Sequence, residues 1–117
     1  MPPQIPDVVL GLMAEKFRML ADATRLSILR ALMAGEKSVG AICDETDQSQ
    51  ANVSKHLKLL AHAGMVARRK EGLQVFYKIS DPLIDKLCKL VCETIARDFE
   101  AAARKGKRVV AALKGRG

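Results

Sequence analysis

Residues 48–80, which read QSQANVSKHLKLLAHAGMVARRKEGLQVFYKIS, decide how this 117-residue chain is expected to fold. A polar start leads into a segment of helical periodicity that ends at Gly64, a residue type that often terminates helices. Two stretches of β-strand character follow, residues 65–70 and 73–79, on either side of the turn residues Glu71-Gly72. The order predicts a helix followed by a two-stranded hairpin, or wing.

The helix in this stretch has one apolar face and one polar face. Val53, Leu57 and Leu60 are spaced i, i+4 and i+7, so they form a narrow core stripe. Ser49 is the expected N-cap, and polar side chains follow it at a helix end whose free N–H groups attract anions. Gln and Asn can pair with adenine, and Lys with guanine or phosphate. The pattern indicates DNA binding, with an ordinary polar helix face as the alternative.

Charge is distributed unevenly along the chain. Residues 1–64 contain seven Lys or Arg and seven Asp or Glu, whereas residues 65–117 contain thirteen and six. The resulting net charge of +7 favours a polyanionic partner, most simply nucleic acid. Residues 106–117 are interpreted as a basic, flexible tail beyond a domain formed by residues 1–105.

The remaining segments complete a mainly helical (α+β) winged helix-turn-helix domain. Pro2, Pro3 and Pro6 predict an irregular start. Five helices are expected, over residues 7–20, 22–33, 38–45, 49–63 and 82–105, with Asp22 or Thr24 and Ser38 as further caps. The first and last helices carry more apolar surface than one small domain can bury, which predicts a homodimer through the terminal helices. Two such subunits would match a palindromic operator.

Composition also argues against other classes of protein. No apolar run approaches the length of a membrane span and the N-terminus lacks a signal-peptide pattern, so a cytoplasmic location is expected. The chain has no CxxC motif, no His placed to activate a Cys and no Gly-rich cofactor loop, so no enzyme activity is expected. A winged-helix regulator that is constitutive or that contacts only protein, in either case without thiol sensing, stays open as an alternative.

Two stretches, LADATRLSILRALMAGEKSVGAI and SQANVSKHLKLLAHAGMVARRKEGLQVFYKI, resemble the ArsR/SmtB family of winged-helix repressors. The resemblance covers about residues 17–80. It implies a homodimer that occupies an operator, blocks transcription and is released by an inducer: a metal ion, a metalloid, an oxidant or sulfane sulfur. The positions that the resemblance implies to contact DNA are Gln50, Asn52, Ser54, Lys55 and His56 on the helix, and Arg68, Arg69, Lys70 and Gln74 on the wing. Ser49, at the polar start of the helix, is expected to join them.

The metal sites of that family are largely missing from this chain. Arsenic-sensing members carry the sequence ELCVCDLC where this chain has EKSVGAIC, so only Cys43 remains. Zinc-sensing members carry Asp and His ligands in the last helix. Here Asp81 stands at the first ligand position, but Leu83, Thr94 and Arg97 stand near the others. The resemblance therefore implies neither a three-thiolate site nor the zinc site.

Cys88 and Cys92 lie four residues apart and should share a helix face. Their Cβ atoms would be about 5–6 Å apart, whereas a disulfide needs roughly 3.5–4.5 Å. Two interpretations stay open: sensing of arsenite, another soft metal ion or a sulfur or oxidant species by these cysteines with Cys43, or a structural role as small apolar side chains. No resident cofactor is expected. His56 is interpreted as a DNA-side residue and His62 as a surface residue, and neither as a zinc ligand.

Overall fold

The computed structural model describes residues 4–115, so the expectations for Pro2, Pro3 and Arg116 lie outside the described residues. The chain divides into two compact units, Met1–Pro82 and Leu83–Gly117. The first is called the body below. None of the helices in residues 4–115 combines the length and the apolar character that a membrane-spanning helix requires.

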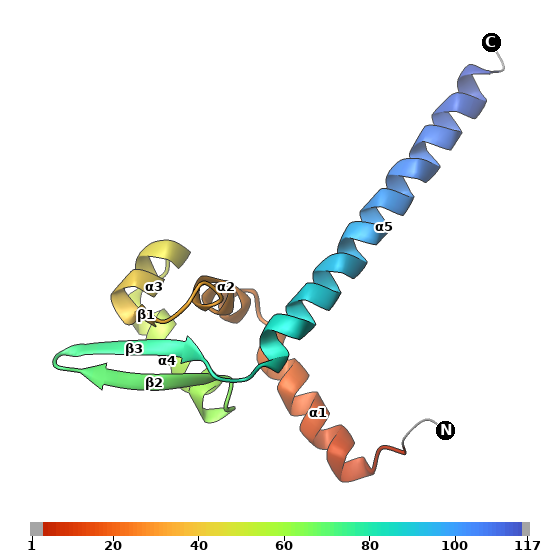
Figure 1. Cartoon of the computed structure of the whole chain (residues 1–117). Helices are drawn as coiled ribbons and strands as arrows, with labels where there is room; N and C mark the ends of the chain where they lie inside the picture. Colours follow the sequence, from red (N-terminus) through yellow and green to blue (C-terminus); the bar gives the residue numbers. More distant parts are fainter. Residues whose placement is uncertain (1–3, 116–117) are drawn as a thin grey trace. The chain divides into compact units, whose positions relative to one another are not determined.

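The body contains four helices (Figure 1). They are α1 (Asp7–Leu20), α2 (Ala23–Leu32), α3 (Val39–Thr46) and α4 (Gln50–His62). Side-chain caps begin three of them. Ser38 and Ser49 were the predicted caps, and Asp22 was one of the two candidates for α2. Asp22 Oδ1 accepts from the Arg25 amide at 3.0 Å. Ser38 Oγ accepts from the Ala41 amide at 3.1 Å, and Ser49 Oγ accepts from the Asn52 amide at 3.1 Å.

The wing belongs to an antiparallel sheet of three strands rather than two. Its strands are β1 (Lys37–Ser38), β2 (Val66–Glu71) and β3 (Gln74–Ile79), in the order β1-β3-β2. Two residues are too few to show a strand period, which is why β1 was missed. The predicted turn is also wrong by one residue, because Glu71 pairs with Gln74 and the turn is Gly72-Leu73. Gly72 has a φ of 60°, which glycine adopts without a steric penalty.

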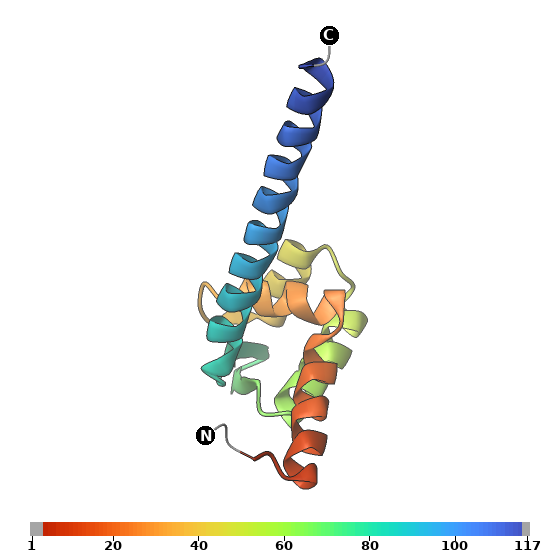
Figure 2. The same cartoon turned by 90° about the vertical axis from the view of Figure 1, so that its right-hand side faces the viewer.

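The core of the body lies where α2, α3, α4 and the sheet meet. The predicted stripe Val53, Leu57 and Leu60 is fully buried, which confirms the helical period. The other fully buried residues include Ile28 and Leu29 of α2, Ile42 of α3 and Met65, which directly precedes β2. Figure 2 shows these helices with the hairpin pointing away from the viewer. The prediction of a mainly helical winged helix-turn-helix with five helices is confirmed.

The second unit is one helix, α5 (Leu83–Lys114), of 32 residues. The predicted end near Lys105 is wrong, and residues 106–114 continue the helix instead of forming a separate tail. Residues 107–114 consist of Lys, Arg, Val, Ala and Leu, so good helix formers predominate and one glycine, Gly106, does not end the helix. Every described residue after Cys88 is exposed, including the large apolar residues Ile95 and Phe99.

Candidate nucleic-acid interface

A hollow of about 420 Å³ separates the exposed face of α4 from the wing. Gln50, Ser54 and Lys58 line one side of it from successive turns of α4. The start of α3 and the wing complete the lining with Ser38, Val39, Gly40, Arg68, Leu73, Gln74, Val75 and Tyr77. The hollow is therefore bordered by amide and hydroxyl groups and by two cations, which suits a polyanion.

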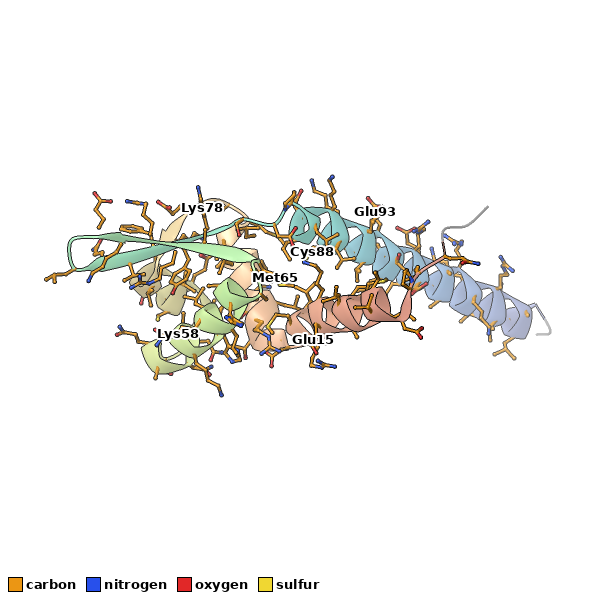
Figure 3. The ribbon with its side chains drawn as sticks, turned by 90° about the horizontal axis from the view of Figure 1, so that it is seen from below. Glu15, Lys58, Met65, Lys78, Cys88 and Glu93 are labelled. Carbon is orange, nitrogen blue, oxygen red and sulfur yellow. The ribbon has the colours of Figure 1, made fainter. Side chains whose placement is uncertain are left out.

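Strand register decides which basic residues of the wing point toward the hollow. Arg68 is paired with Tyr77 and Lys70 with Val75, so these four share one face of the β2-β3 hairpin. Tyr77 and Val75 line the hollow, which places Arg68 and Lys70 on its side. Lys78 is paired with Ala67 and lies on the opposite face. In Figure 3, Lys78 projects from the side of the hairpin away from α4, whereas Lys58 projects from α4 itself.

Arg69 lies on the same outer face as Lys78 and is held by the protein. Its Nη2 donates to Glu36 Oε1 at 2.7 Å, its Nε donates to Glu36 Oε2 at 3.3 Å, and its Nη1 donates to Glu71 Oε2 at 2.6 Å. The guanidinium also lies 4.7 Å from the ring centroid of Phe76. The hydrogen bond from Arg69 lowers the pKa of Glu36, and both carboxylates raise the pKa of Arg69. The geometry makes Arg69 a brace between the wing and the loop before β1.

His56 is buried and does not line the hollow, so its sequence-based assignment as a DNA-contacting residue is corrected. Only 9% of its surface is exposed, and its Nδ1 lies 3.4 Å from Arg25 Nη1. The reason is helical geometry: His56 follows Val53 by three residues and precedes Leu60 by four, which places it beside the core stripe. His62 is exposed, as expected.

The other predicted helix positions have different environments. Gln50 and Lys55 are exposed on α4, and Ser54 is half-buried. Ser49 is exposed, but its hydroxyl oxygen caps the helix. Asn52 is half-buried, and its Nδ2 donates to Gln48 Oε1 at 2.7 Å, which steadies the turn before α4.

The predicted contacts lacked seven residues that line the hollow: Ser38, Val39, Gly40, Lys58, Leu73, Val75 and Tyr77. Lys58 could have been found from its spacing, since it follows Gln50 and Ser54 in steps of four residues. Ser38 and Gly40 belong to the start of α3 and reach the hollow only because β1 joins the sheet beside them. No local signal in the sequence shows that pairing.

The three cysteines are free thiols, and they do not form one cluster within the body. Cys43 lies in α3 and is half-buried, whereas half-buried Cys88 and exposed Cys92 lie in α5. Burial raises the pKa of Cys88, and the neighbouring Cys92 and Asp85 raise it further. Within residues 4–115, no three His, Cys, Asp or Glu side chains are grouped so that they could hold a metal ion. The α5 pair therefore offers two thiols to a soft ligand, but no third.

An exposed polar helix face, a basic wing and the hollow between them define a DNA-binding protein of the winged helix-turn-helix class. The model of a helix-turn-helix domain family matches residues 20–69. The HTH-type transcriptional regulator KmtR of Mycobacterium tuberculosis is 36% identical over 86 residues, 74% of this chain and 66% of that regulator. The chain thus spans just under two thirds of that relative.

Two further comparisons agree with this class. The arsenical resistance operon repressor of Escherichia coli K12 is 40% identical over 78 residues, 66% of this chain and 67% of the repressor. A homodimeric winged helix-turn-helix DNA-binding domain from Mycobacterium bovis superimposes with a TM-score of 0.72 and 30% identity, covering 86% of this chain and 94% of that domain. This chain belongs to the ArsR/SmtB family of transcriptional regulators.

Proposed function

We propose that this chain is a transcriptional repressor that occupies a palindromic operator as a homodimer. The single observation that carries the proposal is the hollow between α4 and the wing, lined by Gln50, Ser54, Lys58 and Arg68. In the proposed complex α4 enters the major groove, and the phosphate backbone of the adjacent strand lies against the wing.

The proposed contacts follow the faces of the two elements. Gln50, Ser54, Lys55 and Lys58 read or approach base edges from α4, while Ser49 and Asn52 form the helix end that points at phosphate. On the wing, Arg68, Lys70 and Gln74 contact the backbone, and Arg69 supports them from the outer face. His56 is not part of this set, because it is buried.

The proposed dimer uses the apolar surface of α1 and α5. Val91, Ile95 and Phe99 recur on α5 in steps of four residues and are between 48% and 73% exposed. Contiguous apolar surface of this extent on a helix commonly marks a protein interface. The homodimeric state of the similar domain from M. bovis supports a homodimer for this chain.

The experiment that tests operator binding compares two substitutions in the same wing that each remove one positive charge. Arg68→Ala should weaken binding to the DNA upstream of the gene, and the slope of log K against log salt should fall by about one, since one phosphate contact is lost. Lys78→Ala removes the same charge from the opposite face of the hairpin and should leave both quantities nearly unchanged. Gel shifts at several salt concentrations measure both. Equal effects of the two changes would contradict the proposed orientation, and salt-insensitive binding would favour a protein partner.

The inducer proposed for the repressor is a thiophilic species, recognised by Cys88 and Cys92 with Cys43 as a further candidate. The support is the pair of thiols one helical turn apart on α5, together with the similarity to an arsenical resistance repressor. Soft ions such as arsenite bind thiolates in preference to oxygen ligands.

A panel of arsenite, zinc, cadmium, copper, persulfide and peroxide, each tested for release of bound DNA, identifies the class of inducer. The variant with Cys88→Ser and Cys92→Ser should still bind the operator but lose its response. A response that survives in this variant would place the sensor elsewhere and favour a structural role for both cysteines.

A further inference from the structure

Arg25 of α2 connects three helices of the body through one side chain. Its Nε donates to the Met19 carbonyl oxygen at 2.7 Å and its Nη2 donates to the Arg18 carbonyl oxygen at 3.2 Å, both at the end of α1. Its Nη1 lies 3.4 Å from Nδ1 of His56 in α4. The side chain is only 14% exposed, so these contacts are largely shielded from water.

The chemistry of the two side chains decides the direction of their contact. A guanidinium has donors only, so in this contact Arg25 donates and Nδ1 of His56 is the acceptor. The carbonyl oxygens of the last turn of a helix have no partners within that helix. Arg25 therefore satisfies the end of α1 and an acceptor on α4 at the same time.

The position of His56 makes this contact relevant to DNA binding. His56 precedes Lys58 by two residues and follows Ser54 by two, and both of those line the hollow. A rotation or shift of α4 that broke the contact with Arg25 would move these two residues within the hollow. Among the described residues, no buried side-chain nitrogen or oxygen lacks a hydrogen-bond partner, so the junction is satisfied as built.

We propose that Arg25 and His56 are positioning residues for DNA recognition. They hold the recognition helix at a set rotation relative to the end of α1 and raise operator affinity without touching DNA. The proposal rests on the operator binding proposed above. Because α1 is also proposed as a dimer helix, the junction is a direct mechanical connection between the subunit contact and the DNA-reading face.

The test uses two substitutions of His56 that differ in one property. His56→Gln keeps an acceptor for Arg25, since the amide oxygen can receive its N–H, whereas His56→Leu fills similar volume without an acceptor. Operator affinity should fall about tenfold for His56→Leu and stay within about threefold of wild type for His56→Gln. The salt slope should be unchanged in both, whereas Arg68→Ala, which removes a proposed phosphate contact, should lower it by about one.

A second variant keeps the proposal testable if His56→Leu does not fold. Arg25→Lys retains the charge but cannot span two carbonyl oxygens and an imidazole, so it should weaken operator binding with an unchanged salt slope. Combining it with His56→Leu should add little to the larger single effect, because both changes break one junction. Urea unfolding of each variant confirms that the binding assays use folded protein.

Several results would overturn the proposal. The first two are an unchanged operator affinity in His56→Leu and an equal loss of operator affinity in His56→Gln and His56→Leu. The others are a salt slope lowered by about one in either variant, and fully additive effects of Arg25→Lys and His56→Leu on operator affinity. Failure of the proposed function is distinguishable, since the wild-type protein itself would then show no salt-dependent operator binding.

Discussion

The body and α5 use apolar residues in different ways. In the body, the apolar stripe of α4 is fully buried against neighbouring elements, as Val53, Leu57 and Leu60 show. In α5 an equally regular series, including Ile95 and Phe99, remains exposed over most of the helix. The α2–α4 part of the body thus buries its apolar residues in a core, whereas α5, like α1, which has no buried residue, presents a surface suited to association. Stability and assembly should respond to mutation separately in these two regions.

The largest expected effect of a single substitution is in the body. Leu57→Ala removes a fully buried side chain from the centre of the core and should lower the free energy of unfolding by about 2–5 kcal/mol. Urea denaturation at low protein concentration measures it. Ile95→Ala is the matched change in α5 and should lower the free energy of unfolding much less, because Ile95 is 49% exposed. Similar losses in both variants would remove the distinction between the two regions.

An intermediate effect is expected on association. Phe99→Ala removes an aromatic side chain that is 73% exposed, and its burial in the proposed dimer would contribute about 1.5–3 kcal/mol. The dissociation constant of the dimer should therefore rise roughly 10- to 100-fold, as measured by sedimentation equilibrium. Arg97→Ala, two residues away and on another face of the helix, is the control. If both substitutions raise the dissociation constant of the dimer equally, or neither raises it, the apolar series is not the interface.

The smallest effect concerns the brace between Glu36 and Arg69 in the body. Because Arg69 lowers the pKa of Glu36, this pair stabilises the folded wing above the ordinary Glu pKa of about 4.5 and loses that contribution as pH falls through the lower folded-state value. The effect should be small, since the pair is exposed to solvent and screened by salt.

The Glu36 prediction can be checked by following its side-chain carbon shift by NMR between neutral and acidic pH. Glu36→Gln should remove that titration, and Phe76 resonances next to Arg69 should then change less with pH. A titration midpoint at or above the ordinary Glu value would contradict the brace.

Local sequence signals were sufficient for most of the body. The spacing of apolar residues predicted α1 and α4 closely, and short polar residues before α2, α3 and α4 marked their caps. They succeeded because helix period and capping depend on residues only three or four positions apart. The wing was also recognised from its alternation, although its turn was placed one residue early.

Non-local pairing caused the errors. Glu36 and Arg69 are 33 residues apart, and Arg25 and His56 are 31 apart, so neither contact leaves a local pattern. His56 was assigned to the DNA face through the family resemblance, yet it is buried, and Arg25 provides the partner that allows its burial. The strand β1 was missed for a related reason, since it exists only through its pairing with β3.

By itself, the sequence determined the order of helices and hairpin, the caps, the core stripe of α4 and the basic excess in the second half of the chain. Periodicity, capping and charge are properties of neighbouring residues, and they survive without knowledge of the fold. Only the tertiary structure decided which cations face the hollow, which one braces the wing, and that His56 is a buried partner of Arg25. These outcomes depend on strand register and on helix packing, which bring distant residues together and can turn a polar side chain inward.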